Sequence, residues 1–186
     1  MQIEQLSKAF DGQTVLQDVT FSLERGVTCL MAPSGRGKTT LLRILLGLET
    51  ADSGEIRDLP ARWGVMFQEN RLLEDLTAME NLRFAAGRGL DEDAAHRLLT
   101  RLGLGGEGSK RVREYSGGMM RRLALARALL VPSDALALDE PFTGLDEENR
   151  EVCLQIIAEV AKQKPVLMIT HEPGDAKALN AAVISL

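Results

Sequence analysis

One short segment carries the residue types that hold a polyphosphate, and it reads Ala32-Pro33-Ser34-Gly35-Arg36-Gly37-Lys38-Thr39-Thr40. Glycines let backbone N–H groups face the phosphate oxygens, the lysine supplies a cation, and the following threonine offers a hydroxyl to Mg²⁺. The usual pattern begins with glycine where this chain has Ala32. If that position needs a positive φ, its methyl group would cost about 1–2 kcal/mol. We therefore predict that residues 33–40 bind nucleotide phosphates, with tolerable strain at Ala32.

Two carboxylates follow an apolar run further along the chain, Ala135-Leu136-Ala137-Leu138-Asp139-Glu140. Open α/β sheets bind ligands at the carboxyl ends of their strands, so this pair is expected near the phosphate loop. There Asp139 could hold Mg²⁺ and Glu140 could polarise an attacking water. An Asp-Glu pair after a strand is, by itself, more often a solvated turn. Together with Lys38 and Thr39, the chemical interpretation is favoured.

A third candidate element opens with a serine and two glycines, Tyr115-Ser116-Gly117-Gly118-Met119-Met120-Arg121-Arg122. Serine is a strong N-cap, and the glycines would expose N–H groups that attract an anion at the helix start. The plain alternative is an ordinary capped helix. Long cations near a helix start are commonly surface residues, so we assign Arg121 and Arg122 no catalytic role.

The apolar pattern predicts which strands and helices position these groups. The run 27–31 before the loop reads as a strand, and leucines at helical spacing after Lys38 read as a helix that ends at Gly47. A polar-apolar alternation around Asp11-Gly12 predicts an antiparallel hairpin of residues 3–6 and 15–23. Four more short apolar runs predict a parallel sheet buried on both faces, at 63–67, 135–138, 166–169 and 182–186.

Between 72 and 130 the pattern is helical, which indicates an inserted helical lobe. Its predicted helices cover residues 78–86, 91–102 and 117–130. A further amphipathic helix over 147–162 places Val152, Ile156, Ile157 and Val160 on one face.

Composition sets outer limits on the class of protein. The 186 residues fit one domain, and 45% hydrophobic with 26% charged residues is typical of a globular protein. A net charge of −5 and a pI near 5.2 argue against nonspecific binding to nucleic acid. Neither a signal-peptide pattern nor a membrane-spanning apolar run is present, so we expect a cytoplasmic protein. Cys29 and Cys153 are expected to be free, buried thiols.

The order of loop, Ser-Gly-Gly helix and Asp-Glu strand resembles the nucleotide-binding subunit of the ATP-binding cassette (ABC) family, over essentially the whole chain. The resemblance implies an α/β fold: a P-loop NTPase core with a mostly parallel sheet flanked by helices, an N-terminal antiparallel β-subdomain and an inserted α-helical subdomain. The single domain 1–186 would then divide into a β-subdomain (1–26 with 50–60), the core (27–49, 61–71 and 134–186) and a helical subdomain (72–133).

Further site residues follow from the resemblance alone. Phe10 would stack on adenine, Gln68 would reach Mg²⁺ and the attacking water, Asp146 would contact a second subunit, and His171 would contact the γ-phosphate. Each has a plain alternative: a hairpin residue for Phe10, a surface amide for Gln68 and a helix N-cap for Asp146. The other histidine, His96, is expected to be only solvated.

The resemblance also implies trans contacts and a metal set. Ser116, Gly117, Gly118 and Met119 would contact the ATP of a second subunit, although Tyr115 and Met119 stand where the family usually has Leu and Gln. Methionine lacks the hydrogen bonds of an amide, so the trans contact is expected to be weaker. The implied Mg²⁺ ligands are Thr39, Gln68 and Asp139.

The implied activity is Mg²⁺-dependent ATP hydrolysis at a composite dimer interface, with Lys38, Gln68, Glu140 and His171 as catalytic residues. It would energise a separate integral membrane permease, contacted through residues 68–86, with the subunit peripheral on the cytoplasmic face of the membrane. The cofactors would be ATP and Mg²⁺, the partners a second ABC ATPase subunit and the permease, with no nucleic acid. Two alternatives stay open: a soluble ABC ATPase that remodels a partner, and an ATP-dependent dimerisation switch without turnover.

Overall fold

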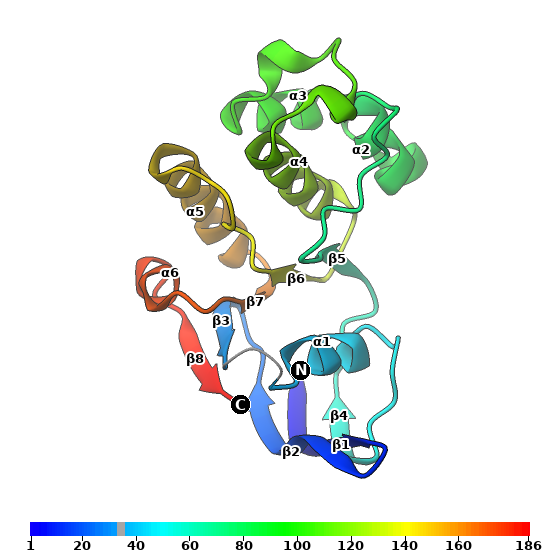
Figure 1. Ribbon diagram of the computed structural model, residues 1–186, viewed down its shortest axis with the longest axis vertical. Helices are drawn as coiled ribbons and strands as arrows, with labels where there is room; N and C mark the ends of the chain where they lie inside the picture. Colours follow the sequence, from blue (N-terminus) through cyan, green and yellow to red (C-terminus); the bar gives the residue numbers. More distant parts are fainter. Residues whose placement is uncertain (33–35) are drawn as a thin grey trace.

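The computed structural model describes residues 1–32 and 36–186 (Figure 1). Pro33, Ser34 and Gly35 of the predicted binding loop therefore lie outside the described residues. The strands are β1 (Gln2–Phe10), β2 (Gln13–Ser22), β3 (Gly26–Met31), β4 (Ser53–Arg57), β5 (Trp63–Met66), β6 (Ala135–Asp139), β7 (Pro165–Ile169) and β8 (Ala182–Ser185). The α-helices are α1 (Lys38–Leu45), α2 (Ala78–Ala86), α3 (Glu92–Arg101), α4 (Gly117–Leu130), α5 (Glu147–Ala161) and α6 (Pro173–Ala178).

A five-stranded sheet forms the centre of the fold, with strand order β5-β6-β7-β3-β8 and every pair parallel. Strand β6 is buried along its whole length, as its continuous apolar run predicts. The expected burial is wrong for β8, whose Val183 is 53% exposed. This strand ends the described sheet and is paired on one side, with β3. The central strands end together, which brings Asp139 towards the loop after β3.

The antiparallel hairpin forms around Asp11 and Gly12, both of which have positive φ, and its strands extend beyond the predicted ranges. With β4 they make a three-stranded sheet of order β2-β1-β4. Its inner face shares one hydrophobic cluster with α1 and with the parallel sheet, including Ile3, Leu41 and Ile169. This packing fixes β2 against the start of α1, where phosphate binding is predicted.

Helices α2, α3 and α4 form a lobe beyond β5, drawn in green in Figure 1. The side chain of Thr77 caps α2 in a capping box with Glu80, and Asp91 caps α3. Helix α4 packs on both helices and on β5, so it joins the lobe to the parallel sheet. Among the described residues, no helix is long and apolar enough to cross a membrane.

Helix α5 packs on the sheet through the predicted face: Ile156 and Ile157 are buried, and Val152 and Val160 are half-buried against the same core. Cys153 is also buried on this helix. Cys29 and Cys153 are both free and buried, as expected. The six-residue helix α6 was not predicted, although a proline at its first position is a start signal.

Candidate active site

Gly37 lies at the start of α1 with φ +81° and is its N-cap. A Cβ placed on this residue would lie 2.6 Å from the main-chain oxygen of Val15 on β2. Only glycine therefore fits this turn without a shift of the backbone. Lys38 follows, and its ammonium group donates a hydrogen bond to the main-chain oxygen of Ala32. Ala32 is not among the described non-glycine residues with positive φ, so the strain expected from its methyl group is absent.

A cavity of about 300 Å³ opens beside this turn. Its described lining comes from β2, the start of α1, the segment after β5 and the end of β6. The lining residues are Val15, Arg36, Gly37, Lys38, Thr39, Thr40, Gln68, Asp139 and Glu140. The fold thus brings together the predicted phosphate loop, both carboxylates and the glutamine.

Asp139 ends β6 and is only 5% exposed. Burial raises the pKa of its carboxyl group, and repulsion by Glu140 raises it further, while Arg121 and Lys38 pull it down. Any cation that enters the cavity beside such a carboxyl group stabilises its ionised form. The position therefore suits a cation ligand better than a solvated turn.

Glu140 follows with φ +50°, a backbone conformation that is uncommon for this residue type. Its amide donates to the Ile169 carbonyl at 2.9 Å, and its carboxylate lies 2.9 Å from Nδ1 of His171. This hydrogen bond is the main reason that the pKa of His171 is raised above its ordinary value. The structure therefore joins two of the four predicted catalytic residues directly.

A buried carboxylate supports the segment that carries His171. Asp175 is 2% exposed, accepts a hydrogen bond from the Thr170 hydroxyl at 2.8 Å, and pairs with Arg150 of α5. The Thr170 hydroxyl in turn accepts from the amide of Glu172 at 3.1 Å. These bonds anchor both neighbours of the histidine to α5.

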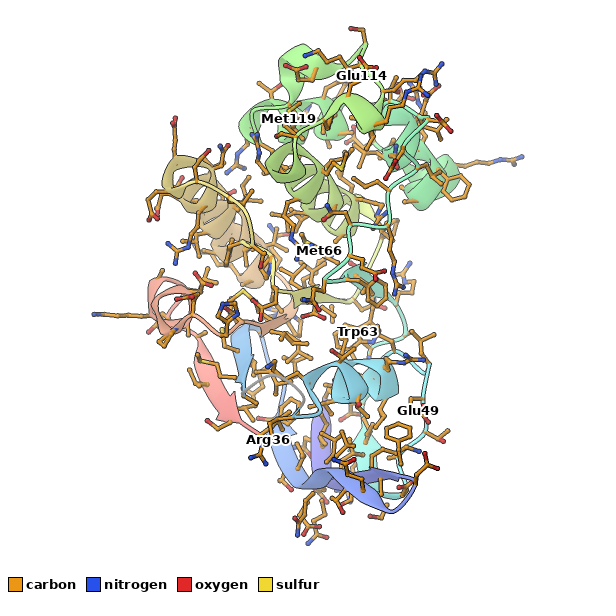
Figure 2. All side chains as sticks on the ribbon, in the orientation of Figure 1. Arg36, Glu49, Trp63, Met66, Glu114 and Met119 are labelled. Atoms are coloured by element: carbon orange, nitrogen blue, oxygen red, sulfur yellow. The ribbon has the colours of Figure 1, made fainter. Side chains whose placement is uncertain are left out.

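Ser116 is the N-cap of α4 and accepts a hydrogen bond from the Met119 amide at 3.3 Å. The cavity at the phosphate loop includes no residue of 116–119 among its described lining. Gly117 and Gly118 instead border a separate hollow of about 230 Å³, whose described lining has Gln68 in common with the loop cavity. Figure 2 shows Arg36 of the loop and Met119 of α4 far apart in space within the one protein molecule.

Comparison with known proteins agrees with this geometry. A sequence profile described as ABC transporter matches residues 16–143. The chain belongs to the ABC transporter family. An aliphatic sulfonates import ATP-binding protein of Pseudomonas savastanoi pv. phaseolicola is 37% identical over 180 residues, which cover 95% of this chain and 76% of that protein. One from Nocardia farcinica is 39% identical over 185 residues, covering 97% and 75%.

Solved ABC structures share the fold. The ATP-binding subunit of an ABC transporter superposes with a TM-score of 0.86 and 28% identity, over 100% of this chain and 85% of the other. A bacterial ABC transporter cassette solved as a dimer also has a TM-score of 0.86, with 24% identity. The match covers 100% of this chain and 93% of the other. The predicted fold class is confirmed.

The membership settles the general activity. As an ABC transporter ATP-binding subunit, the protein binds ATP and is an ATPase that acts with a membrane permease. The individual residue roles stay predictions.

Phe10 is not in the described lining of the loop cavity. Its ring is 42% exposed and lies beneath the ammonium of Lys8 at 5.0 Å.

Other positions specific to the ABC pattern have clear structural settings. Asp146 is the N-cap of α5, where its carboxylate accepts from the Asn149 amide at 2.8 Å. Tyr115, in place of the usual leucine, is buried and donates its hydroxyl to the Glu107 carbonyl at 3.2 Å. Met119 is half-buried against the main hydrophobic core. As expected, His96 is exposed on α3.

One expectation about α4 is wrong. Arg121 is not a surface residue: it is 4% exposed, and its guanidinium reaches the main chain of both Gln68 and Glu140. Apolar periodicity along α4 does not predict that Arg121 is buried. Its guanidinium is held by main-chain oxygens of residues that are distant along the chain.

Proposed function

We propose that two cassettes face each other, so that the Ser-Gly-Gly helix of one closes over the ATP held by the phosphate loop of the other. The observation that carries this proposal is the separation of the two halves within one chain. The described lining of the loop cavity contains no residue of 116–119, and α4 begins in the lobe, away from Arg36 (Figure 2). An anion-attracting helix start that cannot serve its own loop is suited to serve another.

The residues of the loop cavity, together with His171 in an adjoining hollow that shares Glu140, fit in-line attack by water on the γ-phosphorus. Lys38 and the loop amides offset the negative charge of the phosphate oxygens. The Glu140 carboxylate accepts a proton from water as the new P–O bond forms and the bond to the ADP oxygen breaks. His171, held beside Glu140 at 2.9 Å, donates to a γ-phosphate oxygen.

The donor set also fits a magnesium ion brought with ATP. Thr39, Gln68 and Asp139 line the same cavity, and Mg²⁺ takes a few protein oxygens together with substrate phosphates. The raised pKa of Asp139 marks a buried carboxyl that a cation would help to ionise. When bound, the ion would neutralise charge on the β and γ oxygens.

The direction of transport is inferred from relatives. Those at 36–39% identity are named as aliphatic sulfonates import ATP-binding proteins, so we infer that this subunit drives import. We place the permease contact on residues 68–86, where Leu73 and Phe84 are 39% and 74% exposed. The subunit would then lie on the cytoplasmic face of the membrane. The permease would select the solute.

The test uses Glu140→Gln, which removes the base but keeps the side-chain shape. With saturating ATP and Mg²⁺, this variant should lose ATPase activity and sediment as a dimer, whereas with ADP it should be monomeric. Adding Ser116→Arg to it should abolish the dimer. Glu159→Gln, at an exposed ion pair with Arg101, serves as the matched control and should hydrolyse ATP like the wild type. A Glu140→Gln protein that stays monomeric in ATP would contradict the composite site.

A further inference from the structure

Arg121 of α4 lies beneath the active site and contacts the segment that carries Gln68. Its Nη1 donates to the main-chain oxygens of Phe67 at 3.0 Å and Gln68 at 2.8 Å, and to Oδ1 of Asn70 at 3.0 Å. The side chain is buried. One end of the guanidinium therefore fixes the backbone from which Gln68 projects.

The other end of the same guanidinium contacts the catalytic strand. Nη2 donates to the main-chain oxygens of Asp139 and Glu140, both at 2.5 Å. Glu140 has φ +50°, a conformation that persists only where its surroundings hold it in place. Arg121 thus braces the strained residue whose carboxylate is proposed to activate the attacking water.

The chemistry of the contact requires arginine. A buried cation is costly unless several acceptors compensate it, and here Arg121 has five oxygen acceptors on two separate segments. Its planar group donates in two directions at once, whereas the ammonium of lysine is a single point charge. Its Nε is buried without a hydrogen-bond partner among the described residues, so the two Nη groups carry the contact.

We propose that Arg121 is a positioning residue that ties Gln68 and Glu140 to α4, so that both follow the helix whose N-cap is Ser116. The inference rests on the proposed composite site. In that site, α4 contacts the ATP of the partner, while Gln68 and Glu140 act on the ATP of their own chain. Through Arg121, catalysis at the ATP of its own chain then depends on how α4 packs against the ATP of the partner.

Arg127, on the same helix, provides a matched control. It is half-buried and donates to the main-chain oxygens of Asn70, at 2.8 Å, and Arg71. Among the described residues, its hydrogen bonds do not extend to Asp139 or Glu140. Replacing it therefore removes a comparable brace on the segment after Gln68 but leaves the catalytic strand held.

The experiment measures ATPase kinetics, ATP affinity and thermal unfolding for Arg121→Met, Arg121→Lys and Arg127→Met in the full chain. Misplacing catalytic groups lowers turnover without weakening the phosphate contacts, so kcat should fall about tenfold or more in Arg121→Met. The KM and Kd for ATP should stay within about twofold. Arg121→Lys keeps the charge in the buried site but cannot reach both segments well. This variant should therefore fold, and its kcat should fall as in Arg121→Met. Arg127→Met should keep kcat within about threefold.

The outcomes separate this inference from the proposed function. If both Arg121 variants keep wild-type kcat, or if Arg127→Met loses as much, the positioning role is wrong while the composite site stands. A rise in KM and Kd that accounts for the whole loss would also overturn it. If Arg121→Met does not fold, the Arg121→Lys kinetics decide. A Glu140→Gln protein that stays monomeric in ATP would instead contradict the proposed composite site.

Discussion

Nδ1 of His171 lies 2.9 Å from the carboxylate of Glu140, so the group expected to contact the γ-phosphate is bonded to the group expected to activate water. The Nε2 of the same ring lies 3.4 Å from a carboxylate oxygen of Glu172. Two acidic neighbours favour the protonated imidazole and raise its pKa, the contact with Glu140 being the larger cause. The charge of the histidine is thus set by its catalytic neighbour.

The first prediction concerns the titration of His171. Glu140→Gln removes the negative charge, so the pKa of His171 should fall back towards its ordinary value of 6.5. The raised pKa also stabilises the fold, fully below pH 6.5, and this contribution is lost as the pH rises through the higher folded value. Titration of the imidazole proton signals by NMR measures the change. The stability effect will be small because the side chain of His171 is 63% exposed.

The chain has only two histidines, and this gives the titration an internal reference. His96 lies on α3 in the helical lobe, so its signal should have the same shift in both proteins at every pH. Equal His171 titration curves in the wild type and in Glu140→Gln would contradict the assigned cause of its raised pKa.

The second prediction is that Asp139 is kept for function at a cost in stability. Its pKa is raised by burial, so folding favours the protonated carboxyl. The stabilising contribution is present below pH 3.8 and is lost as the pH rises through the raised value. At neutral pH without ATP or Mg²⁺, Asp139→Asn should therefore melt about 2–4 °C higher, or about 1 kcal/mol for a chain of this size. The same variant should lose Mg²⁺-dependent ATPase activity.

Asp58→Asn makes the same chemical change at an exposed site and should leave the melting temperature unaltered. Thermal denaturation followed by circular dichroism compares the two variants with the wild type. A lower melting temperature for Asp139→Asn than for wild type would show that the attraction of its carboxylate to the charges of Arg121 and Lys38 outweighs burial.

The sequence predicted those parts of the site that depend on local chemistry. The ranges of α2 and α4 follow from helical periodicity and caps, and they were predicted to the residue. The carboxylates at the end of β6 follow from the rule that ligands gather at strand ends. These features need only a residue and its near neighbours in the chain.

Other features depend on contacts between distant segments, and the sequence alone missed them. Arg121 looks like a surface cation because its acceptors lie 18–54 residues away. The bond between His171 and Glu140 joins residues 31 apart that lie just after the neighbouring strands β7 and β6. The burial of Tyr115 likewise depends on a carbonyl from another turn of the lobe. In each case, the tertiary fold supplies the partner.

The last prediction separates crowding from backbone strain at the phosphate loop. Gly37→Ala would place a Cβ 2.6 Å from the Val15 oxygen at φ +81°, so β2 or the loop must move and ATP affinity should fall at least about tenfold. Stability should fall by more than the ~1–2 kcal/mol of a left-handed alanine alone. Gly47→Ala, at φ +68° with open space around it, measures that strain alone. Gly106→Ala, with open space and no positive φ, should change neither ATP affinity nor stability. Calorimetric ATP binding and denaturant unfolding give both quantities, and equal losses of stability in the Gly37 and Gly47 variants would show that contact with β2 is unimportant.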